Sequence, residues 1–291
     1  MILLPAARHL RSALAVLSAL VLAACAGGSD PAAVAPSGPP PEVVAMYQSV
    51  QDGDYVIPAV DPGYLTGGNA RQTVPYSGPD LPGTIVVDPH ARVLYYVEEG
   101  GVATRYGIAV GREGRGFTGA AVVSRKAEWP GWTPTANMIR RDPEVYGPYA
   151  GGLPGGLDNP LGARALYLYR GGKDTYYRIH GTNNSSTIGR ATSAGCIRLF
   201  NQDILDLYQR VDLGAPVKVR SLAESIAQEG EMVEGPSGLM LRMDSLPIEV
   251  QEQIRAGMTP WPPFVAQSGI SGENSLGSAE ALEAQGIVAA N

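Results

Sequence analysis

From residue 83 onward, the chain alternates short apolar runs with polar turn residues. The runs are rich in β-branched and aromatic residues and are separated by Asp-Pro and Gly-Gly pairs, a pattern that predicts consecutive β-strands. The predicted strands read TIVVD, RVLYYVEE, VATRYGIAVG, AAVVSRKAEW, ARALYLYR, TYYRIHG and APVKVR. The second and third are expected to form a hairpin across Gly100 and Gly101. We therefore expect a mainly β domain over residues 83–220.

One segment of this domain has the periodicity of a helix. In FNQDILDLYQRVDLG, the apolar residues between 204 and 211 share one helical face, and Gly214 follows as a stop signal. Asn201 is expected to be the N-cap, and the charge of Asp203 favours the helix N-terminus. The predicted fold class is thus mainly β with one clear helix.

The remaining segments have weaker patterns. Residues 42–82 predict mostly loop, with one short helix near residues 43–50. Residues 129–163 are rich in Pro and Gly, and a loop of this length in a compact domain is usually functional. In the C-terminal extension, residues 221–291, the stretch LPIEVQEQIRAGM predicts a short amphipathic helix, and the last 25 residues are expected to be disordered.

The N-terminus predicts an exported lipoprotein. Residues 1–24 combine a basic start with an apolar run that is short for a membrane span, as a secretory signal peptide does. The tetrapeptide LAAC ending at Cys25 resembles a bacterial lipobox, in which the cysteine is lipidated and becomes the new N-terminus. An ordinary signal peptide with Cys25 incidental is the alternative. Lipidation would anchor the protein to a membrane without spanning it.

Two further features bear on location. Ala26 follows Cys25 where inner-membrane retention signals usually carry Asp, which favours a periplasmic protein anchored in the outer membrane. The small and Pro-rich residues 26–41 predict a flexible tether, so residues 25–82 are expected to link the lipid to the catalytic domain.

Composition narrows the class of partner. The chain is 44% hydrophobic and can bury a sizeable core. Loss of residues 1–24 removes two of the 22 Lys and Arg and none of the 28 Asp and Glu, which leaves a net charge of −8. An acidic surface without a basic cluster argues against nucleic acid as a partner.

The chemistry is expected at Cys196 and His180. In an oxidising compartment a solitary thiol is a liability unless it has a function, and Cys196 has no partner once Cys25 is lipidated. A neighbouring imidazole can take the proton of the thiol, and His180 closes a predicted strand 16 residues before Cys196. His90 sits at an Asp-Pro turn and is interpreted as a surface turn residue.

The residues around Cys196 fit the same chemistry. Gly195 allows close approach to the backbone, and backbone N–H groups of residues 194–196 are suited to form an oxyanion hole. Arg198 offers a fork for a carboxylate. A buried cysteine with a satisfied histidine and a surface arginine is the structural alternative. No stretch has metal-ligand spacing, so neither a metal nor a cofactor is expected.

These motifs resemble the catalytic module of L,D-transpeptidases, the YkuD or ErfK/YbiS family. The resemblance rests on HGT, SAGCIRL, NQDILDLY, NPLGARALYL and YRIHGTN, and it covers about residues 83–220. It implies a β-sandwich-like fold and attack on peptidoglycan stem peptides, without a cofactor.

By position, the resemblance makes Cys196 the nucleophile and His180 the general base. Gly181 would orient the imidazole through its backbone, and Ser193 and Arg198 would bind substrate. Many members carry a histidine just before the Gly-Cys pair, where this chain has Ala194; that difference puts the rate or the acceptor in question.

Several alternatives stay open at this point. The thioester formed on the cysteine would pass to an amine of another stem, to a protein, or to water, the last being carboxypeptidase activity. A non-catalytic peptidoglycan-binding lipoprotein is another class, whereas a papain-like enzyme is disfavoured because its cysteine precedes its histidine. Trp129 is expected to pack on the sheet, and Trp132 and Tyr146 either pack there or cover the substrate. Asp88 and Asp174 receive no role.

Overall fold

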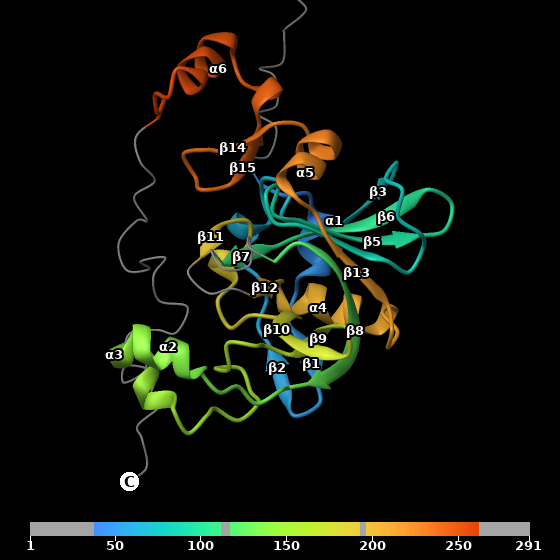
Figure 1. The fold of residues 1–291 in the computed structure, drawn as a ribbon, viewed down its shortest axis with the longest axis vertical. Helices are drawn as coiled ribbons and strands as arrows, with labels where there is room; N and C mark the ends of the chain where they lie inside the picture. The colour runs from blue at the N-terminus through green and yellow to red at the C-terminus, as the bar shows by residue number, and fades with distance from the viewer. Residues whose placement is uncertain (1–37, 112–116, 193–195, 262–291) are drawn as a thin grey trace, which may run out of the picture. The chain divides into compact units, whose positions relative to one another are not determined.

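The computed structural model describes residues 38–111, 117–192 and 196–261 (Figure 1). The predicted leader, Cys25, most of the tether, the segment from Ser193 to Gly195 and the end of the C-terminal extension lie outside these ranges. None of the helices in the described ranges has the length and apolar character needed to cross a membrane.

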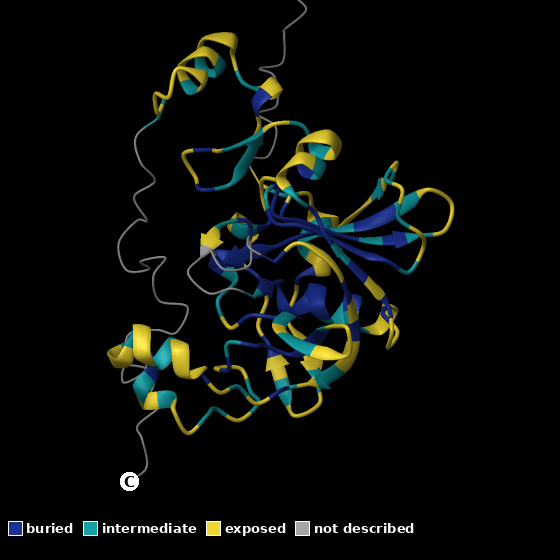
Figure 2. Ribbon diagram, in the orientation of Figure 1, coloured by how far each residue is buried: buried dark blue, intermediate teal, exposed yellow. Residues whose placement is uncertain are grey.

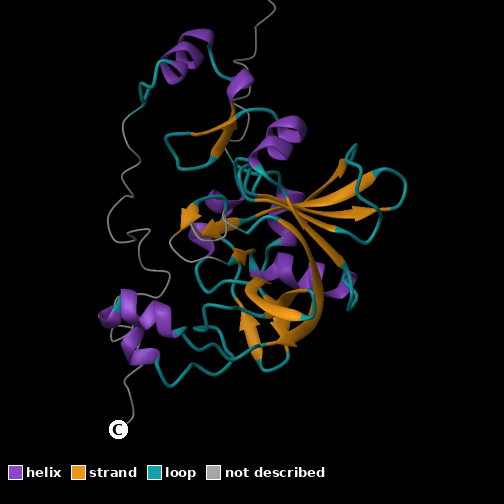
Figure 3. Cartoon of the chain, in the orientation of Figure 1, coloured by secondary structure: helices purple, strands orange, loops and turns teal. Residues whose placement is uncertain are grey.

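A mixed sheet of 11 strands carries the fold, in the order β11-β7-β12-β10-β9-β8-β13-β4-β5-β6-β3 (strands are orange in Figure 3). The bounds of its strands are β3 Gln72–Pro75, β4 Ile85–Asp88, β5 Val93–Glu98, β6 Val102–Gly107, β7 Ala109–Gly111, β8 Gly119–Glu128, β9 Arg164–Arg170, β10 Lys173–His180, β11 Ala191–Thr192, β12 Ile197–Arg198 and β13 Pro216–Val219. The predicted mainly β class is confirmed. Each predicted strand run coincides with an observed strand, and VATRYGIAVG divides into β6 and β7.

Both halves of the sheet share one hydrophobic core with helix α4, Asn201–Arg210. Leu94 of β5, Leu166 of β9 and Leu207 of α4 are fully buried in this core, whose residues are dark blue in Figure 2. Strand β8 joins the two halves because it pairs with β13 on one side and with β9 on the other. Burying each such side chain stabilises the fold by about 1.5–3 kcal/mol.

Helix α4 begins differently from the prediction. It is the predicted helix after Cys196, but Phe200 occupies its N-cap position without a side-chain hydrogen bond. The prediction that Asn201 is the N-cap is therefore wrong: it is the first helical residue, and its side chain bonds to other segments. Asp203 lies in the first turn, as expected, and is fully buried.

Segments that were expected to be loops contain short elements. Before the main domain these are α1 Pro41–Met46, near the predicted short helix, the hairpin strands β1 Val50–Asp52 and β2 Tyr55–Ile57, the 3₁₀ helix η1 Pro62–Leu65, and β3 at the sheet edge. Within residues 129–163 they are α2 Ala136–Arg141, α3 Pro143–Tyr146 and η3 Gly147–Tyr149. Thr135 caps α2 by accepting the N–H of Met138 at 3.2 Å.

The described part of the C-terminal extension folds. Its elements are α5 Leu222–Glu229, the paired strands β14 Met232–Glu234 and β15 Met240–Arg242, η5 Met243–Ser245 and α6 Ile248–Arg255. The last of these falls within the predicted amphipathic helix. We call the segment 232–242 the C-terminal hairpin.

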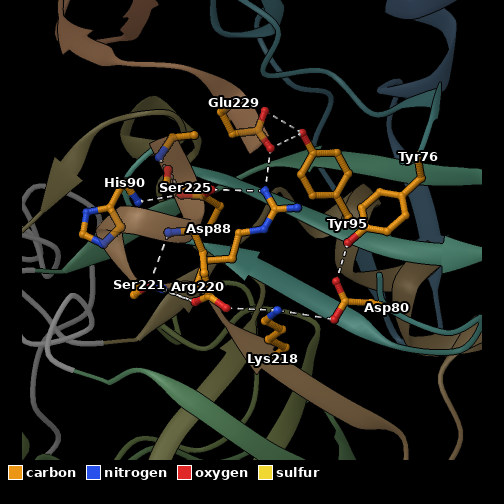
Figure 4. A network of polar contacts seen from close by, with 12 residues as sticks. Tyr76, Asp80, Asp88, His90, Tyr95, Lys218, Arg220, Ser221, Ser225 and Glu229 are labelled. Carbon is orange, nitrogen blue, oxygen red and sulfur yellow. Dashed lines mark hydrogen bonds and ion pairs between the residues drawn. The ribbon is translucent and has the colours of Figure 1, made fainter. Parts of the chain in front are cut away.

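A buried polar network fixes α5 to the sheet (Figure 4). Asp88 accepts a hydrogen bond from the Ser225 hydroxyl at 2.9 Å and pairs with Arg220 at 3.2 Å. Arg220 also donates to Glu229 at 2.6 Å, and the Tyr95 hydroxyl donates to the same carboxylate at 3.0 Å. The extension is therefore tied to β4 and β5 through paired charges.

Candidate functional site

The candidate active site forms where strands β10 and β12 run parallel. Their register pairs Ile179 with Ile197 and His180 with Arg198, so the histidine and the arginine lie on adjacent strands. Cys196 immediately precedes β12 at this edge. The fold thus brings together the three residues that the sequence motif predicts.

Cys196, His180 and Arg198 line one cavity of about 570 Å³. The Cys196 residue is half-buried. The other lining residues are Gly131, Trp132, Thr133, Thr135, Asn137, Met138, Tyr146, Pro160, Leu161, Tyr167, Thr175, Tyr176, Tyr177 and Arg178. The cavity is large enough for part of a peptide, and Cys196 lies on its wall.

His180 is held as a neutral imidazole. Its Nδ1 lies 2.7 Å from the carbonyl oxygen of Gly181. Because a carbonyl can only accept, Nδ1 carries the proton and Nε2 keeps a lone pair. Burial, and then the positive charge of Arg198, lowers the pKa of His180 to about 3. At neutral pH the ring is therefore an uncharged acceptor.

The turn after His180 is fixed by Asn201. Its Oδ1 accepts the N–H of Ala163 at 3.0 Å and that of Thr182 at 3.3 Å, while its Nδ2 donates to the Thr182 carbonyl at 2.9 Å. A Cβ on Gly181 would lie 2.1 Å from Asn201 Oδ1, so only glycine fits there. Asn201 positions the histidine turn, a role that the helix pattern concealed.

Arg198 is a buried cation with open donors. The residue is nearly inaccessible, and its Nε and Nη2 have no hydrogen-bond partner among the residues that the structure describes. Burial lowers the pKa of Arg198 to about 10, which leaves it charged at neutral pH. A buried guanidinium without an anion is costly. The arrangement suits a ligand that brings a carboxylate.

The three aromatic residues considered in segment 129–163 lie in two different environments. Trp129 donates from Nε1 to Asp52 at 2.9 Å and packs against Tyr55 with ring centroids 4.3 Å apart. These contacts are to the β1–β2 hairpin, whereas packing on the main sheet was predicted. Trp132 and Tyr146 both line the cavity, with centroids 6.4 Å apart. Two of the three aromatics thus form part of the cavity wall.

A second arginine reaches the cavity wall from β10. Arg178 donates to both carboxylate oxygens of Asp174, at 2.7 and 2.8 Å, and lies 4.3 Å from the ring centroid of Tyr167. A bulge between Asp174 and Arg178 leaves Tyr176 exposed with φ of 62°. Sequence reasoning assigned none of these residues, because strand alternation does not reveal a bulge.

Other predicted residues lie elsewhere or outside the description. Ser193, Gly195 and Cys25 are outside the described residues. His90 is half-buried at its turn, where its N–H donates to Asp88 at 3.0 Å, and it does not line the cavity with Cys196. Across residues 38–111, 117–192 and 196–261, no group of three or more His, Cys, Asp or Glu could hold a metal ion.

The sequence matches known proteins over this domain. The YkuD family profile, the L,D-transpeptidase catalytic domain, matches residues 82–219. "Probable L,D-transpeptidase ErfK/SrfK" of Escherichia coli strain K12 is 36% identical over 139 residues, which make up 47% of this chain and 43% of that protein. This chain therefore spans less than half the length of that relative.

Two further relatives cover more of their own length. A crystal structure of a Brucella melitensis protein, named a probable carnitine operon oxidoreductase, is 55% identical and covers 50% of this chain and 89% of that one, with a TM-score of 0.37, which is too low to establish a shared fold. YkuD of Bacillus licheniformis, named for L,D-transpeptidase activity, is 31% identical over 163 residues, or 56% of this chain and 81% of that protein. The resemblance predicted from the motifs is confirmed, and the chain belongs to the L,D-transpeptidase family of the YkuD type.

Proposed function

We propose that the protein is a cysteine-dependent L,D-transpeptidase acting on peptidoglycan stem tetrapeptides. The observation that carries this proposal is the cavity shared by the cysteine Cys196, the neutral imidazole of His180 and the buried guanidinium of Arg198. A thiol, a base and an anion-binding group together can perform acyl transfer.

In the first half-reaction Cys196 attacks the carbonyl between the diamino acid at position three and the terminal D-Ala. His180 Nε2 takes the thiol proton as the S–C bond forms, and gives it to the amine of D-Ala as the C–N bond breaks. The product is a thioester. Backbone N–H groups of residues 194–196, including Gly195, are proposed to stabilise the tetrahedral oxyanion.

In the second half-reaction an amine attacks the thioester. His180 accepts the proton of the incoming amine and returns it to the sulfur as the C–S bond breaks, which regenerates the thiol. The amine of a second stem would produce a 3→3 cross-link, and an amine of a protein would attach that protein to the wall. Water would instead make the protein an L,D-carboxypeptidase.

Arg198 is proposed to bind a carboxylate of the stem peptide, and Ser193 is also proposed to contact the substrate. Its open Nε and Nη2 are the donors of a bidentate pair. Gly181 is proposed to hold the imidazole through its carbonyl, at the 2.7 Å distance described above. The location proposed from the sequence is the periplasm, with a lipid on Cys25 and the outer membrane as the favoured site.

The proposal is tested with protein starting at Ala26, purified tetrapeptide muropeptides and a Cys196→Ala control, followed by mass spectrometry. Release of D-Ala with a cross-linked dimer, only when the thiol is present, would establish transpeptidation. Trimmed monomer alone would point to carboxypeptidase activity or to a missing protein acceptor. No D-Ala release from either protein would favour a peptidoglycan-binding lipoprotein.

A further inference from the structure

Residues 188–192 lead toward Cys196, and we call them the nucleophile segment. They are attached to their surroundings at several points. Ile188 accepts a hydrogen bond from Asn69 Nδ2 at 3.2 Å, and the N–H of Gly189 donates to Ile108 at 3.1 Å. Strand β11 then pairs with β7, and β7 pairs on its other side with β12. The strand before Cys196, β11, and the strand after it, β12, therefore both pair with β7.

Arg92 connects this segment to the C-terminal hairpin. Its guanidinium is buried, and Nη1 donates to the carbonyl of Gly189 at 3.0 Å and to that of Gly238 at 2.6 Å. Nη2 pairs with Glu234. Arg92 itself has φ of 57°, an uncommon conformation for a non-glycine residue. One side chain thus joins the strand turn after β4, the nucleophile segment and the extension.

The tip of the hairpin packs on the same place. Gly189 has φ of 81°, and a Cβ there would lie 2.7 Å from Leu239 Cδ2. A Cβ on Gly238 would lie 3.7 Å from side-chain atoms of Arg190. The hairpin therefore contacts the nucleophile segment through apolar packing as well as through the Arg92 hydrogen bonds.

The base is held by different contacts. The turn after His180 is fixed by Asn201 of α4 and by the β10–β12 pairing, and none of the hydrogen bonds described for that turn involves the hairpin. Strand β12, which directly follows Cys196, is common to both residues because it pairs with β10 and with β7. The contacts of Arg92 and of the hairpin are made only on the side that precedes Cys196, so the distance between Cys196 and His180 also depends on them. A shift of about 1 Å in such a pair can cost on the order of 100-fold in rate.

We infer that the C-terminal hairpin is a positioning element for Cys196, and that Arg92 is the positioning residue through which it acts. This inference rests on the proposed role of Cys196 as nucleophile. It gives the extension a function in the reaction: without the Arg92 contacts, the carbonyl of Gly189 loses its donor and the segment before Cys196 moves relative to His180.

The test compares Arg92→Ala with Arg220→Ala in the full-length protein in detergent. Both substitutions remove a buried arginine that pairs with the extension, but the contacts of Arg220 reach Asp88 and Glu229 rather than the nucleophile segment. Leu239→Ala is a milder third variant in case Arg92→Ala does not fold. Circular dichroism at 10 °C first establishes that each variant is folded.

The readout is the rate of alkylation of Cys196 by iodoacetamide from pH 5 to 10, followed on its own peptide by mass spectrometry. A free thiol with pKa of about 8.5 is only about 1% ionised at pH 6.5, whereas a thiol assisted by His180 still reacts there. We expect Arg92→Ala to slow alkylation at pH 6.5 by about tenfold and Leu239→Ala by about threefold, both converging with wild type near pH 10. Arg220→Ala should stay within about twofold of wild type, because the ion pairs of Arg220 join Asp88 and Glu229 and involve no residue of 188–192.

An unchanged pH profile in folded Arg92→Ala and Leu239→Ala would overturn the inference, as would an equal loss in Arg220→Ala, which would mean general loosening. D-Ala release by wild type is measured in parallel. Release of D-Ala with an unchanged Arg92→Ala profile overturns the positioning role alone. Absence of release with a slowed Arg92→Ala profile overturns the proposed function alone.

Discussion

Two buried arginines in this protein have opposite surroundings. Arg220 is 2% exposed and Arg198 is 4% exposed, so both are removed from water to the same degree. Arg220 pairs with Asp88 and Glu229, whereas Nε and Nη2 of Arg198 have no partner in the described part of the chain. Although burial opposes it, hydrogen bonding to Glu229 raises the pKa of Arg220, while burial lowers that of Arg198.

From this difference we expect the charge of Arg220 to be structural and the charge of Arg198 to bind a ligand. A buried charge needs compensation, and the network of Arg220 supplies it within the protein. At Arg198 the protein carries the desolvation cost without the matching anion. A buried polar group without a partner is retained at sites where a bound ligand supplies the missing hydrogen bonds. Each prediction below tests whether a buried charge belongs to the first kind or to the second.

The largest effect is expected on stability at Arg220. Arg220→Ala leaves the carboxylates of Asp88 and Glu229 without their cation, and breaking a buried pair in this way costs about 3–5 kcal/mol of unfolding free energy. Urea denaturation measures it. We expect D-Ala release by the folded variant to remain at the wild-type level, and a loss of activity without a loss of stability would contradict the structural assignment.

Asp203 is a buried charge that is less completely paired than Arg220 but has partners that Arg198 lacks. Like Asp88 it is inaccessible, but its partners are the Tyr47 hydroxyl at 2.8 Å and Arg71 at 3.5 Å. Burial raises the pKa of Asp203 from 3.8 to about 7. The folded state therefore holds the proton more tightly than the unfolded chain, so this group stabilises the fold at low pH and its contribution is lost as the pH rises from 4 to 7.

Asp203→Asn should remove that dependence. The wild-type free energy of unfolding should fall by at most about 1.4 kcal/mol per pH unit because of this group, and the difference between wild type and variant should follow the same slope. Urea denaturation of both proteins at pH 4, 5, 6 and 7 provides the comparison. Parallel curves would mean that Asp203 is ionised in the fold and fully paired, and would contradict this prediction.

At Arg198 the expected effect is on catalysis. Arg198→Ala removes the proposed carboxylate-binding fork, and we expect kcat/KM for D-Ala release to fall by about 100-fold. Since none of the residues described in the structure bonds to Nε or Nη2 of Arg198, the free energy of unfolding should not decrease. Arg198→Lys, which keeps the charge without the fork, should recover part of the rate. A destabilised Arg198→Ala with normal kcat/KM would reverse the comparison.

The sequence predicts the features that depend on neighbouring residues and misses those that depend on contacts between distant segments. The strand runs, α4 and the grouping of His180 with Cys196 follow from local pattern and from a motif confined to a short stretch. The role of Asn201 could not be recognised, because its partners at Ala163 and Thr182 lie far along the chain and N-cap chemistry is a competing use of the same side chain.

The packing of the C-terminal extension on the domain could not be predicted for the same reason. Its pairing with Asp88 and Arg92 joins residues more than 130 positions apart, and short amphipathic segments do not indicate which surface they cover. The short helices of residues 129–163 were hidden by Pro and Gly, which here mark helix starts and turns within a folded segment.

The smallest expected effect is on the pH dependence of kcat/KM, which tests how the charge of Arg198 changes the pKa of His180. Burial and the charge of Arg198 lower the pKa of His180 to about 3, so the imidazole stays a neutral base as the pH falls from 7 to 5. We expect kcat/KM to change by less than about twofold over this interval, whereas a histidine with the ordinary pKa of about 6.5 would cause a loss of about 30-fold. An acidic limb near pH 6.5 in wild type would show that the ring is more hydrated than the fold implies. In Arg198→Ala the limb should move upward but remain below 6.5, because burial is the larger cause and persists.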